Sequence, residues 1–302
     1  MIARAVEVLR AGGLVAFPTE TVYGLGADAA DPDALHRLFA VKGRPTDHPV
    51  IVHVARAAQL DELGREVPAV AHALADALWP GPLTLVVRRN PARVAAVATG
   101  GRDSVGIRVP DHPLALALLD AFGGGVAAPS ANRFGRVSPT TAQHVRDDLG
   151  DDVDMILDGG PSSVGVESTI VDVTGAEPVV LRVGGIAEER LAAIVGAPLA
   201  RRTSGEIAAP GTLASHYAPD TRVVLVNAND LDARAAQLRA EGRTVGVLAA
   251  PADADEHARV LYQRLRDLDR QGLDVILAVL PADSAGLGAA VADRLRRAAT
   301  PR

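Results

Sequence analysis

The chain has 302 residues, a formal net charge of −6 and no cysteine, which excludes disulfides and cysteine-ligated metal sites. Hydrophobic residues make up 48% and charged residues 23%, a balance typical of globular proteins, and the length suits two domains. The sequence shows neither a secretory signal nor an apolar stretch of membrane-spanning length, and its negative charge disfavours a broadly basic nucleic-acid surface, so we expect a cytoplasmic protein with no membrane partner.

Helix and strand patterns are intermixed over residues 1–200. Helices are predicted at 2–10, 31–42, 67–78, 113–122, 140–149 and 188–195. Strands are predicted at 14–17, 50–54, 83–87, 105–109, 126–128, 155–157, 169–173 and 179–181. The second helix has a clear start, an Asp31 cap followed by Pro32, and Gly43 is placed to end it. This order predicts one α/β domain with a twisted, mixed sheet.

The rest of the chain divides into a linker and a second domain. Residues 201–220 lack sustained periodicity and contain several Pro and Gly, so we interpret them as a linker. Between 221 and 302, strands are expected at 223–226, 245–248 and 275–280, and helices near 231–240, near 256–268 and up to 297. This βαβαβα order predicts a small Rossmann-like parallel sheet, and without a Gly-x-Gly-x-x-Gly fingerprint it does not imply dinucleotide binding.

A polar segment at 18–26 follows the first buried strand. The hydroxyls of Thr19 and Thr21 flank the Glu20 carboxylate, which is unusual for a loop that only turns the chain. Two glycines in the same segment allow a close backbone approach or a positive φ. The segment is therefore a candidate for holding a ligand.

Two cations, Lys42 and Arg44, flank Gly43 at the end of the second predicted helix. For this tripeptide alone, basic residues that stabilise a helix C-terminus are the favoured explanation. The alternative is a polyphosphate clamp, in which Lys42 supplies a point charge and Arg44 a planar fork of donors.

Hydroxyl and amide side chains follow the strand at 126–128. Ligands of α/β sheets bind at the carboxyl ends of strands, which makes Ser130 and Asn132 candidates, although such a loop more often satisfies its own backbone. Ser138 or Thr140 is expected to cap the next helix, and a helix N-terminus also suits a phosphate.

Arg108 and Arg182 lie within or at the end of apolar strands. A buried cation needs a partner, and for Arg108 both a ligand carboxylate and an Asp or Glu side chain remain open. His53 ends another strand, where a structural histidine is commoner than a ligand. Ser168 follows a glycine-containing turn into a strand.

Taken in order, these segments resemble the threonylcarbamoyl-AMP synthases, which are built on the YrdC-like fold. The resemblance covers nearly all of residues 1–200, and the linker at 209–219 resembles that of the longer, two-domain branch. The matching segments are 18–26, Lys42-x-Arg44, 104–110, Ser130-x-Asn132, 167–170 and 181–184.

The resemblance implies synthesis of L-threonylcarbamoyladenylate from L-threonine, bicarbonate or CO2, and ATP, with release of pyrophosphate. The product would serve N6-threonylcarbamoyladenosine formation, so tRNA and a downstream transferase machinery are the implied partners. Mg2+ is expected with ATP, and no dedicated carboxylate cage for a metal is visible in the sequence.

Site residues are implied position by position. Lys42 and Arg44 would be catalytic. The threonine site would use Thr21, His53, Arg108, Ala128 and Ser168. The ATP site would use Lys42, Arg44, His48, Ser104, Ser130, Asn132, Ser138 and Arg182, with His216 and Tyr217 of the linker closing over it.

Three other functions remain open. A hydrogenase-type or O-carbamoyltransferase shares the fold, but such proteins carry zinc-binding or additional catalytic modules that this cysteine-free chain lacks. A double-stranded-RNA or tRNA-binding module of the same fold, without its own catalysis, is disfavoured by the charge of −6. A purely structural role leaves the cations at turns and strand ends unexplained.

Overall fold

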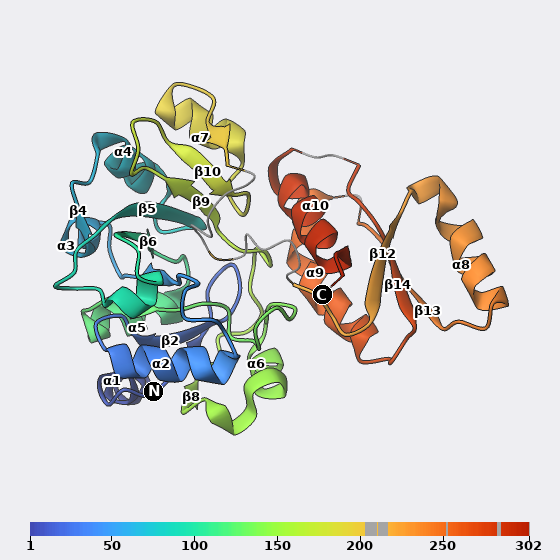
Figure 1. Ribbon diagram of the computed structural model, residues 1–302, viewed down its shortest axis with the longest axis horizontal. Coiled ribbons are helices and arrows are strands. Elements are labelled where there is room, and N and C mark those ends of the chain that lie inside the picture. The colour runs from blue at the N-terminus through green and yellow to red at the C-terminus, as the bar shows by residue number, and fades with distance from the viewer. Residues whose placement is uncertain (203–209, 211–216, 252, 283–284, 302) are drawn as a thin grey trace.

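The computed structural model describes residues 1–202, 210, 217–251, 253–282 and 285–301. Two lobes are visible in Figure 1, a large lobe at residues 1–202 and a small lobe at residues 217–301. Each lobe is built around its own β-sheet, as the two predicted sheet patterns required. No helix among these residues combines the length and the apolar character needed to cross a bilayer.

The large lobe contains an 11-stranded mixed sheet with strand order β11-β10-β9-β5-β6-β3-β7-β2-β1-β8, and β4 pairs with β5. Parallel and antiparallel neighbours alternate irregularly; β3 runs parallel to β6 and antiparallel to β7. The strands are β1 Val15–Phe17, β2 Gly24–Asp28, β3 Ile51–His53, β4 Gly64–Arg65, β5 Leu83–Arg89, β6 Ser104–Arg108, β7 Val126–Ala127, β8 Met155–Ile156, β9 Thr169–Asp172, β10 Val179–Arg182 and β11 Ala200–Arg201.

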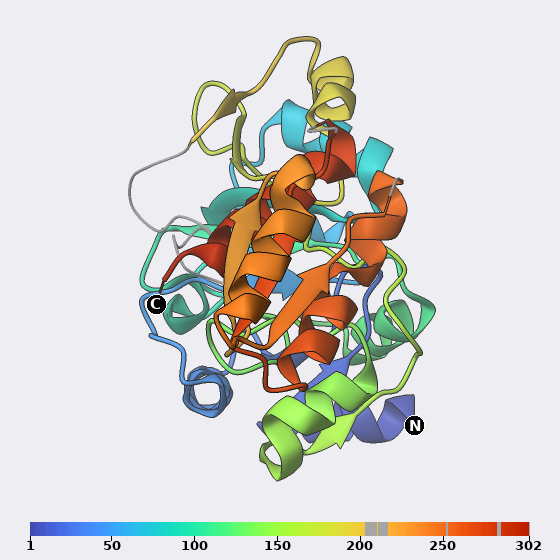
Figure 2. The same ribbon diagram turned by 90° about the vertical axis from the view of Figure 1, so that its right-hand side faces the viewer.

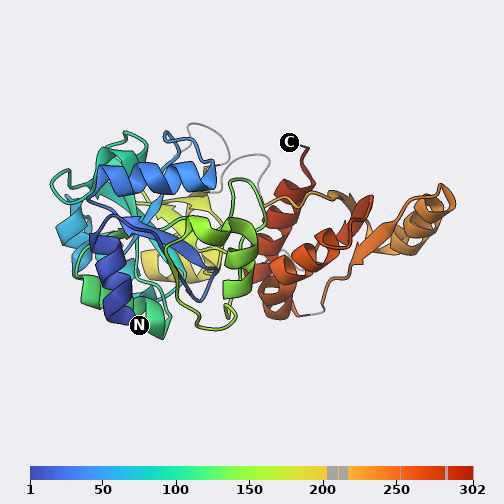
Figure 3. The same ribbon diagram turned by 90° about the horizontal axis from the view of Figure 1, so that it is seen from below.

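Helices flank this sheet and bury an aliphatic core against it (Figures 1 and 3). The core is dominated by Ala, Val and Leu, as the low aromatic content predicts, and Leu25, Leu38 and Leu85 are fully buried in it. The helices are α1 Ile2–Arg10, α2 Pro32–Lys42, α3 Gln59–Leu63, α4 Ala69–Leu78, α5 Pro113–Phe122, α6 Ala142–Leu149 and α7 Glu188–Val195, with 3-10 turns η1 Ala96–Thr99 and η2 Gly150–Asp152.

The structure confirms most predicted elements of the large lobe, adds β2, β4, β11 and α3, which were not predicted, and moves one helix cap. Helices α1, α5 and α7 have the predicted bounds, and α2 has its Asp31 cap and ends at a left-handed Gly43. Strand β2 was expected to be loop, because glycines at alternate positions leave no β-branched signal. Helix α3 was also missed. The cap of α6 is Thr141, whose hydroxyl accepts from the His144 amide at 3.2 Å, rather than Ser138 or Thr140.

The small lobe is the predicted parallel sheet, with strand order β12-β14-β13. Helix α8 covers the face away from the large lobe and lies in front of the sheet in Figure 2. Helices α9 and α10 lie between this sheet and the large lobe (Figures 1 and 3). The elements are β12 Arg222–Val226, η3 Ala228–Asp230, α8 Leu231–Ala240, β13 Val245–Leu248, α9 Ala254–Asp269, β14 Val275–Val279 and α10 Gly286–Ala299.

The two lobes share a hydrophobic cluster. Val22, Val137 and Val166 of the large lobe are buried in the same cluster as Leu261 of α9 and Val291 of α10. A partly buried ion pair, with 2.6 Å between Arg266 Nη2 and Asp148 Oδ2, adds a polar link between α9 and α6. The interface therefore fixes α9 and α10 against the loops of the large lobe that follow β1 and precede β9.

Candidate active site

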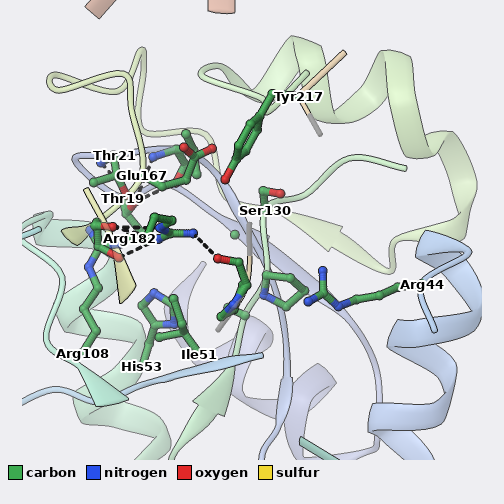
Figure 4. Close-up of a pocket in the computed structure, with 16 residues that line it drawn as sticks. Thr19, Thr21, Arg44, Ile51, His53, Arg108, Ser130, Glu167, Arg182 and Tyr217 are labelled. Carbon is green, nitrogen blue, oxygen red and sulfur yellow. Dashed lines mark hydrogen bonds between the residues drawn. The ribbon is translucent and has the colours of Figure 1, made fainter. Parts of the chain in front are cut away.

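One pocket gathers most of the polar segments singled out from the sequence (Figure 4). Its empty volume is about 560 Å³, including the part open to solvent. The strand register brings two of these residues together. His53 pairs with Arg108 across the parallel strands β3 and β6, so both lie at the carboxyl ends of their strands. The pocket is lined by Thr19, Thr21, Val22, Gly24, Arg44, Ile51, His53, Arg108, Ala128, Pro129, Ser130, Glu167, Ser168, Arg182, Pro210 and Tyr217.

The five residues predicted for threonine all line this pocket. They come from the loop after β1, the ends of β3 and β6, the segment after β7 and the residue before β9, and they are Thr21, His53, Arg108, Ala128 and Ser168. We call this group the threonine side. Thr21 Oγ1 lies 2.8 Å from Thr19 Oγ1, and Thr19 in turn donates to the Val22 carbonyl at 2.6 Å, so the loop holds its own hydroxyls in place.

The buried partner of Arg108 is Glu20. Arg108 Nη2 lies 2.7 Å from Glu20 Oε1, and both side chains are 5% exposed. The contact lacks hydrogen-bonding geometry, and both carboxylate oxygens are buried without a hydrogen-bond donor among the described residues. Arg108 Nε donates to the Gly81 carbonyl at 3.3 Å. The sequence left open whether Arg108 pairs with a ligand carboxylate or with an Asp or Glu side chain. The structure shows Glu20 as its partner, and Arg108 also lines the pocket.

His53 is held neutral. Burial and, second, the nearby Arg108 cation lower the pKa of this imidazole to about 3. Its ring meets Phe17 edge to face at a centroid distance of 6.0 Å, and Nδ1 is buried with no hydrogen-bond partner among the described residues. A neutral imidazole in the pocket lining can exchange a hydrogen bond with a polar group of a ligand.

Arg44 and Arg182 supply the positive charge of the pocket, and with Ser130 they form what we call the cation side. Arg44 Nη2 donates to the Pro49 carbonyl at 2.8 Å, its guanidinium lies over the Phe134 ring, and burial lowers its pKa to about 10, so it stays charged at neutral pH. Arg182 donates from Nε and Nη2 to the Ser168 carbonyl at 3.0 and 2.9 Å. Both cations are therefore fixed before any ligand arrives.

Lys42 and Asn132 lie behind the pocket rather than in its lining. Lys42 Nζ donates to the carbonyls of Ser130 and Asn132, each at 2.5 Å. Asn132 Nδ2 donates to the carbonyls of Arg133 and Arg136. Burial, followed by the charge of Arg44, lowers the pKa of Lys42 well below its ordinary value. These two residues shape the loop that presents Ser130, and their direct contact with ATP stays a prediction.

The other predicted ATP residues are scattered. His48 is buried against Phe134 with ring centroids 5.5 Å apart. Ser104 begins β6 and Arg108 ends it, so their Cα atoms are roughly 13 Å apart along the strand. Tyr217 lines the pocket, and His216 lies outside the described residues. Ser138 does not cap a helix; its hydroxyl donates to Glu167 at 2.7 Å, and its contact with ATP stays a prediction.

Glu167 is the lining residue that sequence reasoning missed. It directly precedes Ser168 and is 7% exposed, yet its carboxylate accepts hydrogen bonds from Ser138, from Tyr262 and from Arg294 Nε at 2.7 Å. Burial alone would raise its pKa, but Arg294 and then Arg182 lower the pKa of Glu167 to about 2. Its cationic partner lies 127 positions away in the second lobe, and no local pattern announces such a pairing.

The arrangement can hold an anion and a small zwitterion side by side. Two fixed guanidinium groups face a cavity whose other wall carries hydroxyls, a neutral imidazole and Arg108, which Glu20 pairs from outside the lining. Among the described residues, no group of three His, Cys, Asp or Glu side chains is placed to hold a metal ion. The groups that line the pocket and could bind a ligand are chiefly cations and hydroxyls.

Comparison with known proteins covers both lobes. Residues 7–184 match the family model described as Telomere recombination, and residues 186–300 match that of the threonylcarbamoyl-AMP synthase C-terminal domain. The Pyrococcus abyssi protein named threonylcarbamoyl-AMP synthase is 43% identical over 97% of this chain and 92% of its own length. Its Bacillus subtilis namesake is 39% identical over 99% of this chain and 92% of its own length.

Comparison with solved structures points to the same family. The Pyrococcus abyssi Sua5 structure complexed with L-threonine matches with a TM-score of 0.93 and 43% identity, and the match covers 99% of this chain and 94% of that one. Full-length HypF in its phosphate- and nucleotide-bound form matches 61% of this chain and 29% of its own, with a TM-score of 0.53. At 17% identity, that likeness shows a shared fold and nothing more.

Proposed function

The chain belongs to the threonylcarbamoyl-AMP synthase family, and we propose that its pocket joins L-threonine, bicarbonate or CO2, and ATP into L-threonylcarbamoyladenylate with release of pyrophosphate. The observation that carries this proposal is one cavity lined by both the threonine side and the cation side. A nucleotidyl transfer needs both substrates in one site, because the acceptor oxygen has to reach the α-phosphorus.

The reaction has two balanced steps. The threonine amine forms a C–N bond to the carbon of CO2 and loses one proton, or it reacts with bicarbonate and releases water; either route gives a carbamate. A carbamate oxygen then forms a bond to the α-phosphorus of ATP, while the bond from that phosphorus to the bridging oxygen breaks and pyrophosphate leaves. No covalent enzyme intermediate is required, so the lack of cysteine is no obstacle.

On the threonine side, Arg108 and the neutral His53 would hold the amino acid. The guanidinium fork matches a carboxylate, and the pairing with Glu20 orients Arg108 in its buried position. The vacant Nδ1 of His53 would receive a hydrogen bond from the substrate. Ser168 and Thr21 add hydroxyls on the same wall.

On the cation side, Arg44 and Arg182 would offset the negative charge of the triphosphate as pyrophosphate separates. Lys42 would act through the loop that carries Ser130. Mg2+ would arrive with ATP as part of the substrate, because the lining carboxylate Glu167 is already engaged by three donors. Catalysis would then rest on positioning and charge stabilisation.

Two wider features belong to the same proposal. The product would be consumed by a transferase that modifies tRNA, which makes that enzyme and tRNA the expected partners. The protein would work in the cytoplasm, where ATP and tRNA are both present. A binding module without catalysis does not account for relatives named as synthases along nearly the whole chain.

The test is a pyrophosphate-release assay with ATP, Mg2+, bicarbonate and each amino acid in turn. We expect release that depends on both L-threonine and bicarbonate, and little release with serine or valine. The proposal fails if pyrophosphate appears at the same rate without threonine, or if no amino acid supports release from folded protein.

A further inference from the structure

The Glu167 carboxylate lies where the pocket meets the small lobe. Figure 4 shows it on the pocket wall near Arg182 and Tyr217. From the large lobe it receives only the Ser138 hydroxyl, at 2.7 Å, among the hydrogen bonds resolved for its side chain in the described residues. Its remaining donors are Tyr262 of α9, at 3.0 and 2.8 Å to the two oxygens, and Arg294 of α10.

Arg294 is the cation that balances this carboxylate. Its side chain is fully buried, with Nε 2.7 Å from Glu167 Oε2 and Nη2 donating to the Val183 carbonyl at 3.1 Å. Its guanidinium also lies over the Tyr217 ring, 5.0 Å from the centroid. These contacts hold the Arg294 guanidinium in one position, so its charge is fixed in space. A flexible surface arginine would not provide such a fixed charge. The small lobe therefore inserts one positive charge at the wall of a pocket that the large lobe builds.

The consequence concerns the sign of the charge inside the pocket. Glu167 lines the same cavity as Arg44 and Arg182, the groups proposed to receive the triphosphate. An uncompensated carboxylate in this weakly solvated place would repel a polyphosphate and would compete for those cations. Arg294 offsets the charge of Glu167, whose Oε1 stays bonded to Ser138. Arg294 also pairs with Asp293 at 2.6 Å, and Asp293 is balanced in turn by Arg297 at 3.0 Å.

We propose that Arg294 is a positioning residue for ATP: it cancels the charge of Glu167 and fixes this carboxylate, so that the small lobe sets the nucleotide affinity of a pocket in the large lobe. The inference rests on the proposed function for the identity of the ligand. It predicts that losing Arg294 harms ATP binding far more than threonine binding, because the threonine side has its own ion pair.

The groups around Glu167 determine how the charge of this carboxylate, and with it ATP affinity, depends on pH. These groups are Ser138, Arg182 of β10, Tyr217 before β12, Tyr262 of α9 and Arg294 of α10, and Asp293 lies behind Arg294. Burial raises the pKa of both tyrosines, so they stay neutral near pH 7. Without Arg294, Arg182 and the Ser138 hydrogen bond would still oppose burial, but the largest lowering influence would be lost and the pKa of Glu167 would rise. Acidification would then neutralise the carboxylate and restore ATP affinity.

The experiment measures Mg-ATP affinity by calorimetry, and KM for ATP and for threonine, in the full-length protein. Arg294→Met should weaken ATP binding at pH 8 by about tenfold or more, with less than about a threefold change in KM for threonine. The loss should shrink as the pH falls from 8 to 6, whereas the wild type shows no such recovery. The matched control is Arg296→Met, an exposed arginine on the same helix, which should behave as wild type.

A double variant separates this role from simple detachment of the small lobe. Glu167→Gln/Arg294→Met removes both charges, so it should regain ATP affinity to within about threefold of wild type. The proposal is overturned if Arg294→Met binds ATP normally, or if the folded double variant binds as weakly as Arg294→Met. If Arg294→Met does not fold, Arg294→Lys replaces it: retained charge should preserve affinity, and a folded Lys variant with a tenfold loss contradicts the proposal.

The two proposals fail separately. Calorimetry with Mg-ATP requires no turnover, so it tests Arg294 even if the wild type releases no pyrophosphate with threonine. Conversely, a wild type that shows threonine-dependent release together with an Arg294→Met variant of unchanged ATP affinity would leave the function standing and remove only this inference.

Discussion

Arg108 serves two carboxylates in this account, the buried Glu20 and the carboxylate of threonine. The sequence left the choice between these partners open, and the protein supplies Glu20 at 2.7 Å while keeping Arg108 in the pocket lining. The pair gives a cation in an apolar strand a buried counter-charge before the substrate binds. It also predicts that one substitution affects both stability and threonine use.

Arg108→Ala should raise KM for threonine by at least about 30-fold and KM for ATP by less than about threefold. The unfolding free energy should fall by about 3 kcal/mol, because Glu20 is left buried and unpaired. Steady-state kinetics and urea denaturation measure the two effects. Arg88→Ala, which removes an exposed arginine paired with Glu66, should cost at most about 1 kcal/mol. Equal damage to both substrates would show that the pocket is divided differently.

Because His53 is buried with a lowered pKa, we expect the unfolding free energy to depend on pH. Its pKa is about 3 in the folded protein and 6.5 as the ordinary value, so below pH 6.5 the unfolded chain gains a proton that the folded one refuses. Stability therefore falls as pH drops from 6.5 toward 3, by about 2 kcal/mol between pH 7 and pH 5. His144, with a pKa lowered to about 4 by burial, adds to the decline in the same direction.

Urea denaturation of His53→Asn at the two pH values isolates the share of His53. Between pH 7 and pH 5, the unfolding free energy of the variant should fall by about 2 kcal/mol less than that of the wild type. If the unfolding free energy falls equally in the variant and the wild type, the ring of His53 is already protonated or well solvated in the folded state.

At the scale of elements, the turn after β10 packs tightly against the site. A Cβ on Gly184 would lie 2.3 Å from the Glu167 carbonyl oxygen and 2.4 Å from the Ser168 carbonyl carbon. The backbone of this turn thus packs directly on the segment that carries two pocket residues, and only glycine allows that approach.

Gly184→Ala should lower the unfolding free energy by about 2 kcal/mol and reduce turnover, because the added methyl displaces the segment that carries Ser168. Gly175→Ala is the matched control, since a Cβ there meets nothing closer than 3.8 Å. The control should change stability by no more than about 0.5 kcal/mol. Identical behaviour of the two variants in thermal melts and pyrophosphate assays would refute the packing argument.

The elements with local signals were the predictable ones. Helix α2 has a cap, a proline and a terminal glycine in its own sequence, and α5 begins at a proline and ends at a glycine. Strand β2 was missed because tertiary pairing with β1 and β7 overrides its glycines. The same limit applies to the site: Ser168 and Arg108 lie at predicted strand ends, whereas the contact between Glu167 and Arg294 exists only after two lobes pack.

The whole molecule behaves as one packing unit in this account, although it contains two sheets. Leu295 of α10 is fully buried in the cluster that also includes Val22 and Val166 of the large lobe. A shared core of this kind links the folding of the lobes, as does the buried pair between Glu167 and Arg294. The catalytic lobe should therefore lose stability when the small lobe is damaged.

Leu295→Ala tests this linkage. Its cavity should cost about 2–5 kcal/mol. The single tryptophan, Trp79, lies in the large lobe, so its fluorescence reports that lobe while far-UV ellipticity reports both. In urea the two signals should give one midpoint in wild type and should shift together in the variant. A Trp79 transition that does not move would mean that the lobes unfold independently.

The central claim, that this pocket forms a bond between a threonine-derived carbamate and the α-phosphorus of ATP, is tested most directly by NMR of the product made from 13C-bicarbonate. With L-threonine, ATP and Mg2+, the account predicts a carbamoyl carbon signal that carries the label and is split by two-bond coupling to 31P. A labelled carbon without phosphorus coupling, or AMP and pyrophosphate formed with no label in a threonine adduct, would contradict it.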